Sequence, residues 1–191
     1  MKSTDKEILL TAVEWLDGGY DVELVPLVKA WGSSPRPVGA MAIVRQDGQL
    51  YGSVSGGCIE KQITTTLRNN DSSKLLQYEI TAAQALRFGL TCGGTLQLVF
   101  EKLTDVESLR YIIKQLELRQ RVSRRVNLEG SEVTISSADR NADFSFDGTH
   151  LTKVFGPVWR LILIGAGELS RRVADLALTL DYEVLVCEPR Q

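Results

Sequence analysis

The chain has 191 residues, of which 43% are hydrophobic and 24% are charged, a balance typical of one ample globular domain or of one domain and part of a second. Its formal net charge of −2 argues against nucleic acid as a partner, and equally against an acidic membrane. The charged start, MKSTDKE, interrupts any signal-peptide core, and no apolar run approaches the roughly 20 residues of a membrane span. We therefore expect a cytoplasmic protein. Scattered cysteines at 58, 92 and 187 and the single His150 argue against a disulfide framework, a zinc site or a histidine-based triad.

The first part of the chain alternates between helical and strand patterns. Apolar residues at helical spacing predict a helix from Thr4 to Gly18-Gly19. Strand patterns occupy 22–30 and 39–46, and the second of these turns at QDG into 49–54, which predicts a hairpin. A helix is then expected from Gly56 to about 70, a strand over 75–80, a short helix over 81–88 and a strong strand over 94–103.

The next segment starts with a helical pattern, LRYIIKQLELR, at 109–119. Residues 121–155 are polar and β-like, with turns at NLEG, SADRN and FDG, and predict a β meander that packs on the first part. We expect residues 1–157 to form one N-terminal mixed α/β domain. Within it, 1–104 carries the sequence motifs, and 105–157 supplies the helix and the meander.

Residues 158–191 have the pattern of a βαβ unit. The strand LILI leads into Gly165-Ala166-Gly167, an amphipathic helix follows, and EVLVCE forms a second strand in which we expect Cys187 to be buried. The fold class predicted is thus α/β, with the start of a Rossmann-like doubly wound domain that is incomplete in this chain. Gly165, Gly167 and Glu188 are candidate nucleotide-binding residues. The alternative is a tight turn with a solvated glutamate, since Ser170 stands where the third glycine of the fingerprint would lie.

A stiff loop carries an arginine between the first two predicted strands. In the segment WGSSPRPVGA, prolines on both sides hold Arg36. A guanidinium donates two parallel hydrogen bonds to a phosphate, so an anion-binding role is one interpretation. The other is a rigid loop whose arginine pairs with a local carboxylate.

Two further segments place a cysteine beside a glycine pair. In GSVSGGCIE, at 52–60, glycine N–H groups and a helix start predict an anion site and a stabilised Cys58 thiolate. Glu60 either decorates the helix start or accepts a hydrogen bond from a heterocycle's amino group. The second segment, GLTCGG, contains Cys92. The alternative for both cysteines is a small buried hydrophobe.

Together these segments resemble the XdhC/CoxI family, accessory proteins of molybdenum hydroxylases such as xanthine dehydrogenase. The resemblance rests on GSSPRPVGA, GSVSGGCIE, GLTCGG and the later GAG, although GAGELS lacks the histidine that members often carry after GAG. It implies that the molybdenum cofactor (molybdopterin) is bound as cargo, with Cys58 and Cys92 in contact with the metal or its sulfur. The cofactor-binding residues implied are Ser34, Arg36, Ser55, Gly56, Gly57, Cys58, Glu60, Cys92, Gly93 and Gly94.

The resemblance further implies a maturation chaperone and not a catalyst of substrate turnover. Such a protein binds the cofactor, supports its sulfuration and delivers it to an apo molybdenum hydroxylase, with a cysteine desulfurase as sulfur donor; a homodimer is compatible with the sequence. Three alternatives stay open at this point. They are an NAD-dependent oxidoreductase that uses the GAG turn, a thiol redox switch between Cys58 and Cys92, and a structural accessory domain that binds only a protein.

Overall fold

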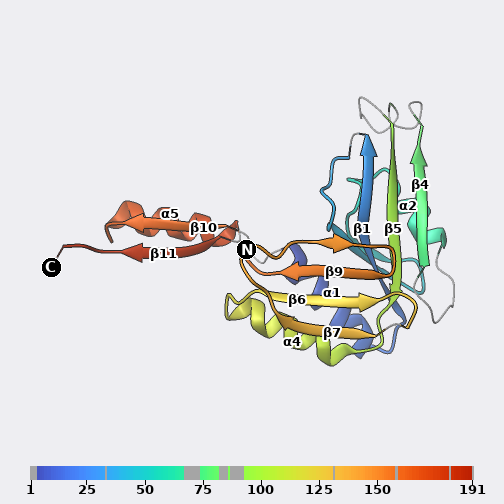
Figure 1. Ribbon diagram of the computed structural model, residues 1–191, viewed down its shortest axis with the longest axis horizontal. Coiled ribbons are helices and arrows are strands. Elements are labelled where there is room, and N and C mark those ends of the chain that lie inside the picture. The colour runs from blue at the N-terminus through green and yellow to red at the C-terminus, as the bar shows by residue number, and fades with distance from the viewer. Residues whose placement is uncertain are drawn as a thin grey trace.

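The computed structural model describes residues 4–32, 34–66, 74–81, 86, 93–130, 132–157, 159–180 and 182–190. These residues form a mixed α/β fold with several sheets, which confirms the predicted class (Figure 1). The largest sheet is antiparallel, with strand order β3-β2-β1-β5-β4. Its strands are β1 (Val22–Gly32), β2 (Met41–Arg45), β3 (Leu50–Gly52), β4 (Lys74–Ile80) and β5 (Gly94–Lys102).

Most predicted elements of this part are confirmed, including the β2–β3 hairpin and the first helix, α1 (Thr4–Asp17). The helix predicted from Gly56 is wrong in its start, because α2 (Glu60–Thr66) begins four residues later. The physical reason is that Gly56 (φ +80°) and Gly57 (φ +111°) lie in the left-handed region, which no right-handed helix uses. The predicted end of that helix near 70 lies outside the described residues, as does the helix predicted over 81–88 except for Leu86.

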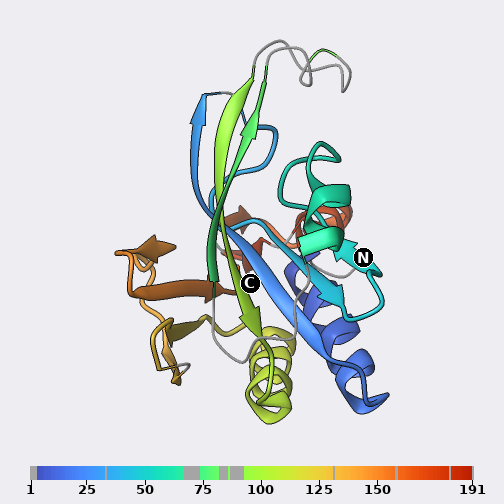
Figure 2. The ribbon, with the colours of Figure 1, turned by 90° about the vertical axis from the view of Figure 1, so that its right-hand side faces the viewer.

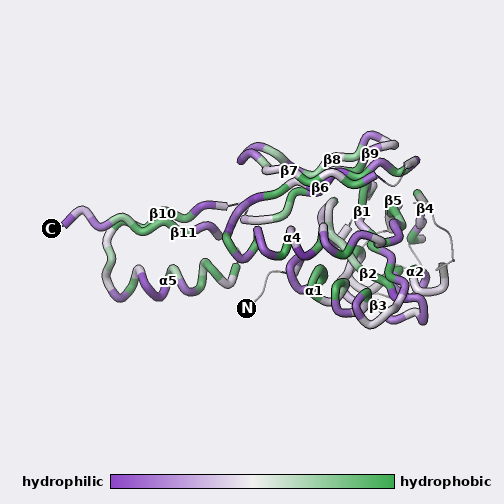
Figure 3. Tube along the Cα trace, turned by 90° about the horizontal axis from the view of Figure 1, so that it is seen from below, coloured by the Kyte–Doolittle hydropathy of each residue, from purple (hydrophilic) through white to green (hydrophobic). Residues whose placement is uncertain are grey.

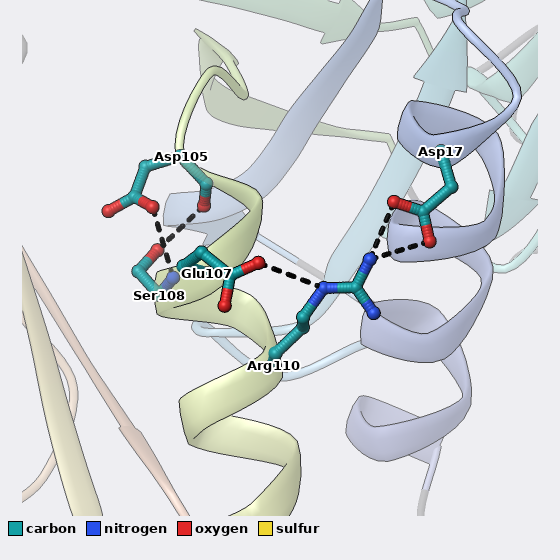
Figure 4. Close-up of polar contacts among 5 residues, drawn as sticks. All are labelled: Asp17, Asp105, Glu107, Ser108 and Arg110. Carbon is teal, nitrogen blue, oxygen red and sulfur yellow. Dashed lines mark hydrogen bonds and ion pairs between the residues drawn. The ribbon is translucent and has the colours of Figure 1, made fainter.

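Helix α4 (Val106–Glu117) packs beside α1 near one end of the sheet (Figure 2). Asp105 caps it, because its side chain accepts a hydrogen bond from the Ser108 N–H at 3.1 Å (Figure 4). Arg110 of α4 then reaches Asp17 at the end of α1, with its Nη2 2.6 Å from Oδ1 and 2.7 Å from Oδ2. The two helices share an apolar cluster that includes Leu9 and Ile112.

The polar segment after α4 forms a second antiparallel sheet from β6 (Val122–Asn127), β7 (Val133–Ser137), β8 (Ser145–Phe146) and β9 (His150–Phe155). Its strand order is β7-β6-β9-β8, so the predicted meander is wrong in its order, although the strands exist. β6 and β9 take the centre because they carry buried apolar side chains such as Val126 and Phe155, whereas β7 is partly or fully exposed along its length. Figure 1 shows these strands crossing the direction of β1 and β5, and Val122, Leu151 and Phe155 pack against the first part as predicted.

A buried ion pair also joins the two sheets. Arg124 of β6 donates from Nη1 to Glu101 Oε2 of β5 at 2.9 Å and from Nη2 to Oε1, and the side chains are only 4% and 5% exposed. The Arg124 Nε is buried and has no hydrogen-bond partner among the described residues.

The C-terminal residues form a parallel βαβ unit from β10 (Arg160–Ile164), α5 (Glu168–Thr179) and β11 (Glu183–Cys187). Figures 1 and 3 both show it extending away from the rest of the protein. Several of its apolar side chains are exposed, among them Ile164 and Leu169 at 78% each. Cys187 is exposed too, so its predicted burial is wrong: β11 pairs with β10 alone among the described residues and leaves this strand end uncovered.

The Rossmann-like character of this unit and the domain boundary between residues 157 and 158 stay predictions. None of the described helices combines the length and the apolar composition needed to cross a membrane.

Candidate functional site

The glycine loop, residues 53–59 between β3 and α2, is organised by the first residue of α2. Oε1 of Glu60 accepts hydrogen bonds from Ser53 Oγ at 2.7 Å, Val54 N at 3.1 Å and Ser55 N at 3.0 Å. Oε2 accepts from Ser55 Oγ and from Gly57 N at 3.0 Å. The carboxylate therefore sits inside its own loop, as an internal anion.

The remaining N–H groups of the loop are satisfied by the two serine hydroxyls. Gly56 N donates to Ser53 Oγ at 2.9 Å, while Cys58 N and Ile59 N donate to Ser55 Oγ at 3.0 and 3.1 Å. Every backbone N–H from 54 to 59 thus donates within the segment 53–60. The Gly56 and Gly57 N–H groups, predicted to face a cargo phosphate, are occupied by the protein itself, and their cofactor-binding role stays a prediction.

The pKa of Glu60 lies below its ordinary value. Burial alone would raise the pKa, but the hydrogen bonds from Ser55, from Ser53 and from the backbone favour the charged form and outweigh it. Glu60 is thus an ionised residue that organises the loop. The spacing from Gly57 to Glu60 was the available sequence signal, because a glutamate that reaches back to an N–H three residues earlier is half of a capping box.

Cys58 lies in an apolar cluster and not on a reactive surface. It is 7% exposed and belongs to a buried cluster with Val54, Ile59 and Ile63. Burial raises the pKa of its thiol, and the charge of Glu60 raises it further. The predicted stabilisation of a Cys58 thiolate is therefore wrong. The glycine pair did not create an anion-stabilising surface for sulfur, because Glu60 already fills it.

The arginine loop, residues 34–40, lies against the glycine loop. A Cβ added to Gly56 would lie 3.2 Å from Cγ of Pro35, so the proline ring packs on this glycine. Within the arginine loop, Ser34 Oγ donates to the Arg36 carbonyl at 2.7 Å. Further along, Lys153 Nζ of β9 donates to the Gly39 carbonyl at 2.8 Å and pairs with Asp5 at 2.9 Å. Two of the three predicted motifs are thus neighbours in space.

Arg36 itself is half-buried, and its Nε is buried without a hydrogen-bond partner among the described residues. Its pairing with a local carboxylate, the alternative interpretation, is not found in the described part of the chain. A buried guanidinium N–H without an acceptor is costly, and an anionic group bound there would supply the acceptor. This donor fits the phosphate of a phosphorylated cargo.

The third motif is described only in part. Cys92 lies outside the described residues, so its predicted contact with metal or sulfur stays a prediction. Gly94 opens β5 and pairs with Gly32 at the end of β1. A Cβ added to Gly32 would lie 2.9 Å from the Gly93 carbonyl oxygen. The glycines after Cys92 therefore contact the strand end that leads into the arginine loop.

The GAG turn of the βαβ unit is closed by residues of its own strand ends. Gly165 (φ +101°) donates to the Cys187 carbonyl at 2.7 Å, and Ala166 N donates to Glu188 Oε2 at 2.7 Å. Hydrogen bonds from Arg190 and from this N–H lower the pKa of Glu188 to about 2. Glu188 thus already has partners here, and nucleotide binding by Gly165, Gly167 and Glu188 stays a prediction. No group of three or more candidate metal ligands occurs in the described ranges.

Comparison with known proteins adds relatives to this geometry. The molybdenum cofactor insertion chaperone PaoD of Escherichia coli (strain K12) is 28% identical over 181 residues, which cover 93% of this chain and 56% of that protein. A protein of Bacillus subtilis (strain 168), named as a probable xanthine dehydrogenase component, is 25% identical over 207 residues, covering 92% and 62%. This chain therefore spans less than two thirds of either relative.

A crystal structure of a xanthine dehydrogenase from Bacillus halodurans shares the fold, with a TM-score of 0.66 at 21% identity over 96% of this chain and 62% of that one. Residues 15–79 match the model of the XdhC and CoxI family, and this range contains both the arginine loop and the glycine loop. The resemblance predicted from the sequence is confirmed, and by this match the chain belongs to the XdhC and CoxI family.

Proposed function

We propose that this protein binds the molybdenum cofactor as cargo and delivers it to an apo molybdenum hydroxylase such as a xanthine dehydrogenase. The name of the relative PaoD, a molybdenum cofactor insertion chaperone, supports the cargo and the delivery role. The name of the Bacillus subtilis relative supports a xanthine dehydrogenase as the enzyme served.

The observation that carries the proposal is the buried Arg36 Nε without an acceptor among the described residues, in a loop whose Pro35 packs on the glycine loop. A pterin cofactor carries a phosphate, and a guanidinium is well suited to bind one. In the proposed complex Arg36 binds the phosphate, and Ser34 keeps the backbone turn that presents it. Gly56 gives Pro35 room for this arrangement, because a side chain there would press on the proline ring.

The sulfur chemistry belongs to the same proposal. A soft thiolate is a fitting ligand for a molybdenum–sulfur centre, and Cys58 is the described cysteine next to the arginine loop. We assign to it a contact with the metal or its terminal sulfur during sulfuration, with a cysteine desulfurase as the source of sulfur and Cys92 as its partner thiol. Because the Cys58 thiol is buried with a raised pKa, this contact requires the glycine loop to move.

The test is to purify the protein after co-expression with the cofactor pathway, oxidise the sample and measure fluorescent pterin. Wild type should carry pterin. The Arg36→Ala variant should carry about tenfold less or lower still, since a hydrogen bond to a charged group contributes about 1.5–3 kcal/mol. Arg172→Ala is the matched control, because Arg172 is exposed on α5 and pairs only locally with Glu168. Wild type without pterin, or Arg36→Ala with as much pterin as Arg172→Ala, would contradict the proposal.

A further inference from the structure

We propose that Glu60, acting through Ser55, is a positioning residue that keeps the Cys58 thiol shut beneath the glycine loop, so that this thiol becomes reachable only when the loop opens. This inference rests on the proposed role of Cys58 and concerns how that role is controlled. It is carried by the hydrogen bonds of segment 53–60 and by the burial of Cys58.

The first step is the chain of contacts from Glu60 to Cys58. A serine hydroxyl has one proton to donate and two lone pairs to accept with. Ser55 is fully buried, donates its proton to Glu60 Oε2, and accepts from Cys58 N and Ile59 N. Its capacity is therefore full. The Glu60 carboxylate fixes the direction of the Ser55 hydroxyl, and that direction leaves both lone pairs for the backbone on either side of the Cys58 side chain.

The second step is where the thiol lies. The Cys58 side chain is buried with Val54 and Ile63 in the cluster that covers one face of the large sheet. Gly56 and Gly57, on the outside of the loop, are exposed, and a Cβ at Gly57 would meet nothing within 4 Å. The thiol thus faces the core and the glycines face outward. A molecule that approaches from the glycine side meets backbone and not sulfur.

The third step is that the closing contacts are local. The hydrogen bonds from the six N–H groups of 54–59 all end on Glu60, Ser53 or Ser55. The loop is joined to the sheet by the Ser53 N–H, which donates to the Met41 carbonyl at 3.1 Å. Release of Glu60 therefore loosens the loop while the strand register of β1, β2 and β5 is kept. Local opening of this kind is distinct from global unfolding.

The test measures alkylation of each cysteine by iodoacetamide under native conditions, without cofactor, by mass spectrometry of tryptic peptides. Cys58, Cys92 and Cys187 fall in separate peptides, because lysine or arginine residues separate them in the sequence. Cys187 is exposed and serves as the internal reference. In Glu60→Gln, labelling of Cys58 relative to Cys187 should rise about 10- to 100-fold, the factor that matches the loss of one hydrogen bond to a charged group.

Controls separate positioning from general destabilisation. Glu117→Gln removes the same charge from an exposed pair with Lys6 and should leave Cys58 labelling unchanged. In Glu60→Gln the faster labelling should not depend on urea below the unfolding transition, as expected of a local opening. Ser55→Ala keeps the carboxylate but breaks the link to Cys58, and it should also speed labelling. It is the second variant if Glu60→Gln does not fold.

Equal labelling of Cys58 in wild type and both variants would overturn the inference. So would labelling that rises with urea in step with global unfolding, since that is the result of lost stability alone. The assay contains no cofactor, so its failure leaves the pterin measurement intact, and a protein without pterin leaves the labelling result intact.

Discussion

Removal of one charge from the ion pair between Glu101 and Arg124 should be among the most destabilising single substitutions in this protein. Glu101→Gln keeps the size of the side chain but leaves Arg124 charged in a site where both side chains are 4–5% exposed. An uncompensated buried charge of this kind costs about 3–5 kcal/mol. Native proteins of this size are stable by about 5–15 kcal/mol in total, so the loss is a large share.

The expected change can be measured by urea unfolding. The fluorescence of Trp15 reports the transition, because this tryptophan is 7% exposed in α1. The unfolding free energy in water should fall by about 3–5 kcal/mol. The Tm should drop by roughly 6–20 °C, at about 2–4 °C per kcal/mol for a chain of this length.

Two comparisons decide whether the reasoning is right. Glu117→Gln breaks an exposed pair with Lys6, whose side chains are 58% and 19% exposed, and should cost less than about 1 kcal/mol. The double variant Glu101→Leu/Arg124→Met should recover most of the loss, because apolar residues of similar volume often replace a buried pair without cost. Glu101→Gln with no larger effect than Glu117→Gln would refute the argument.

Three further outcomes follow from local geometry. Gly52→Ala should lose at least about 1–3 kcal/mol in thermal unfolding, because φ is +91° and the new Cβ would lie 2.7 Å from the Met41 carbonyl oxygen. Gly167→Ala, with ordinary φ and no atom within 4 Å, should be close to neutral; similar losses in both would count against the steric explanation. Carboxyl NMR should find Glu188 titrating at about 2, so that it stays charged at any pH well above that value. Arg190→Ala should raise this pKa toward its ordinary value, and an unchanged value would show that Arg190 is not its main partner.

Much of the secondary structure could be predicted because it depends on local pattern. Alternating or continuous apolar residues with turn residues between them marked β1, β2, β4 and β5, and helical spacing marked α1 and α4. The order β7-β6-β9-β8 could not be predicted in this way, because it depends on which strands bury side chains against another part of the chain. The start of α2 was missed because a glycine pair is compatible with either a helix start or a left-handed turn.

For the candidate site, the amino-acid sequence by itself determined which residues are present and that two glycine-rich motifs lie near strand ends. It also determined the family, since the motifs at 34–40 and 52–60 carry the resemblance that the match over residues 15–79 confirms. Only the tertiary structure decided that Pro35 packs on Gly56, that Glu60 takes the loop N–H groups, and that Cys58 faces the core while Cys187 is exposed. The physical reason is that the partner of a hydrogen-bonding group or a thiol is set by distances between segments that the fold brings together, and residue type and spacing do not fix those distances.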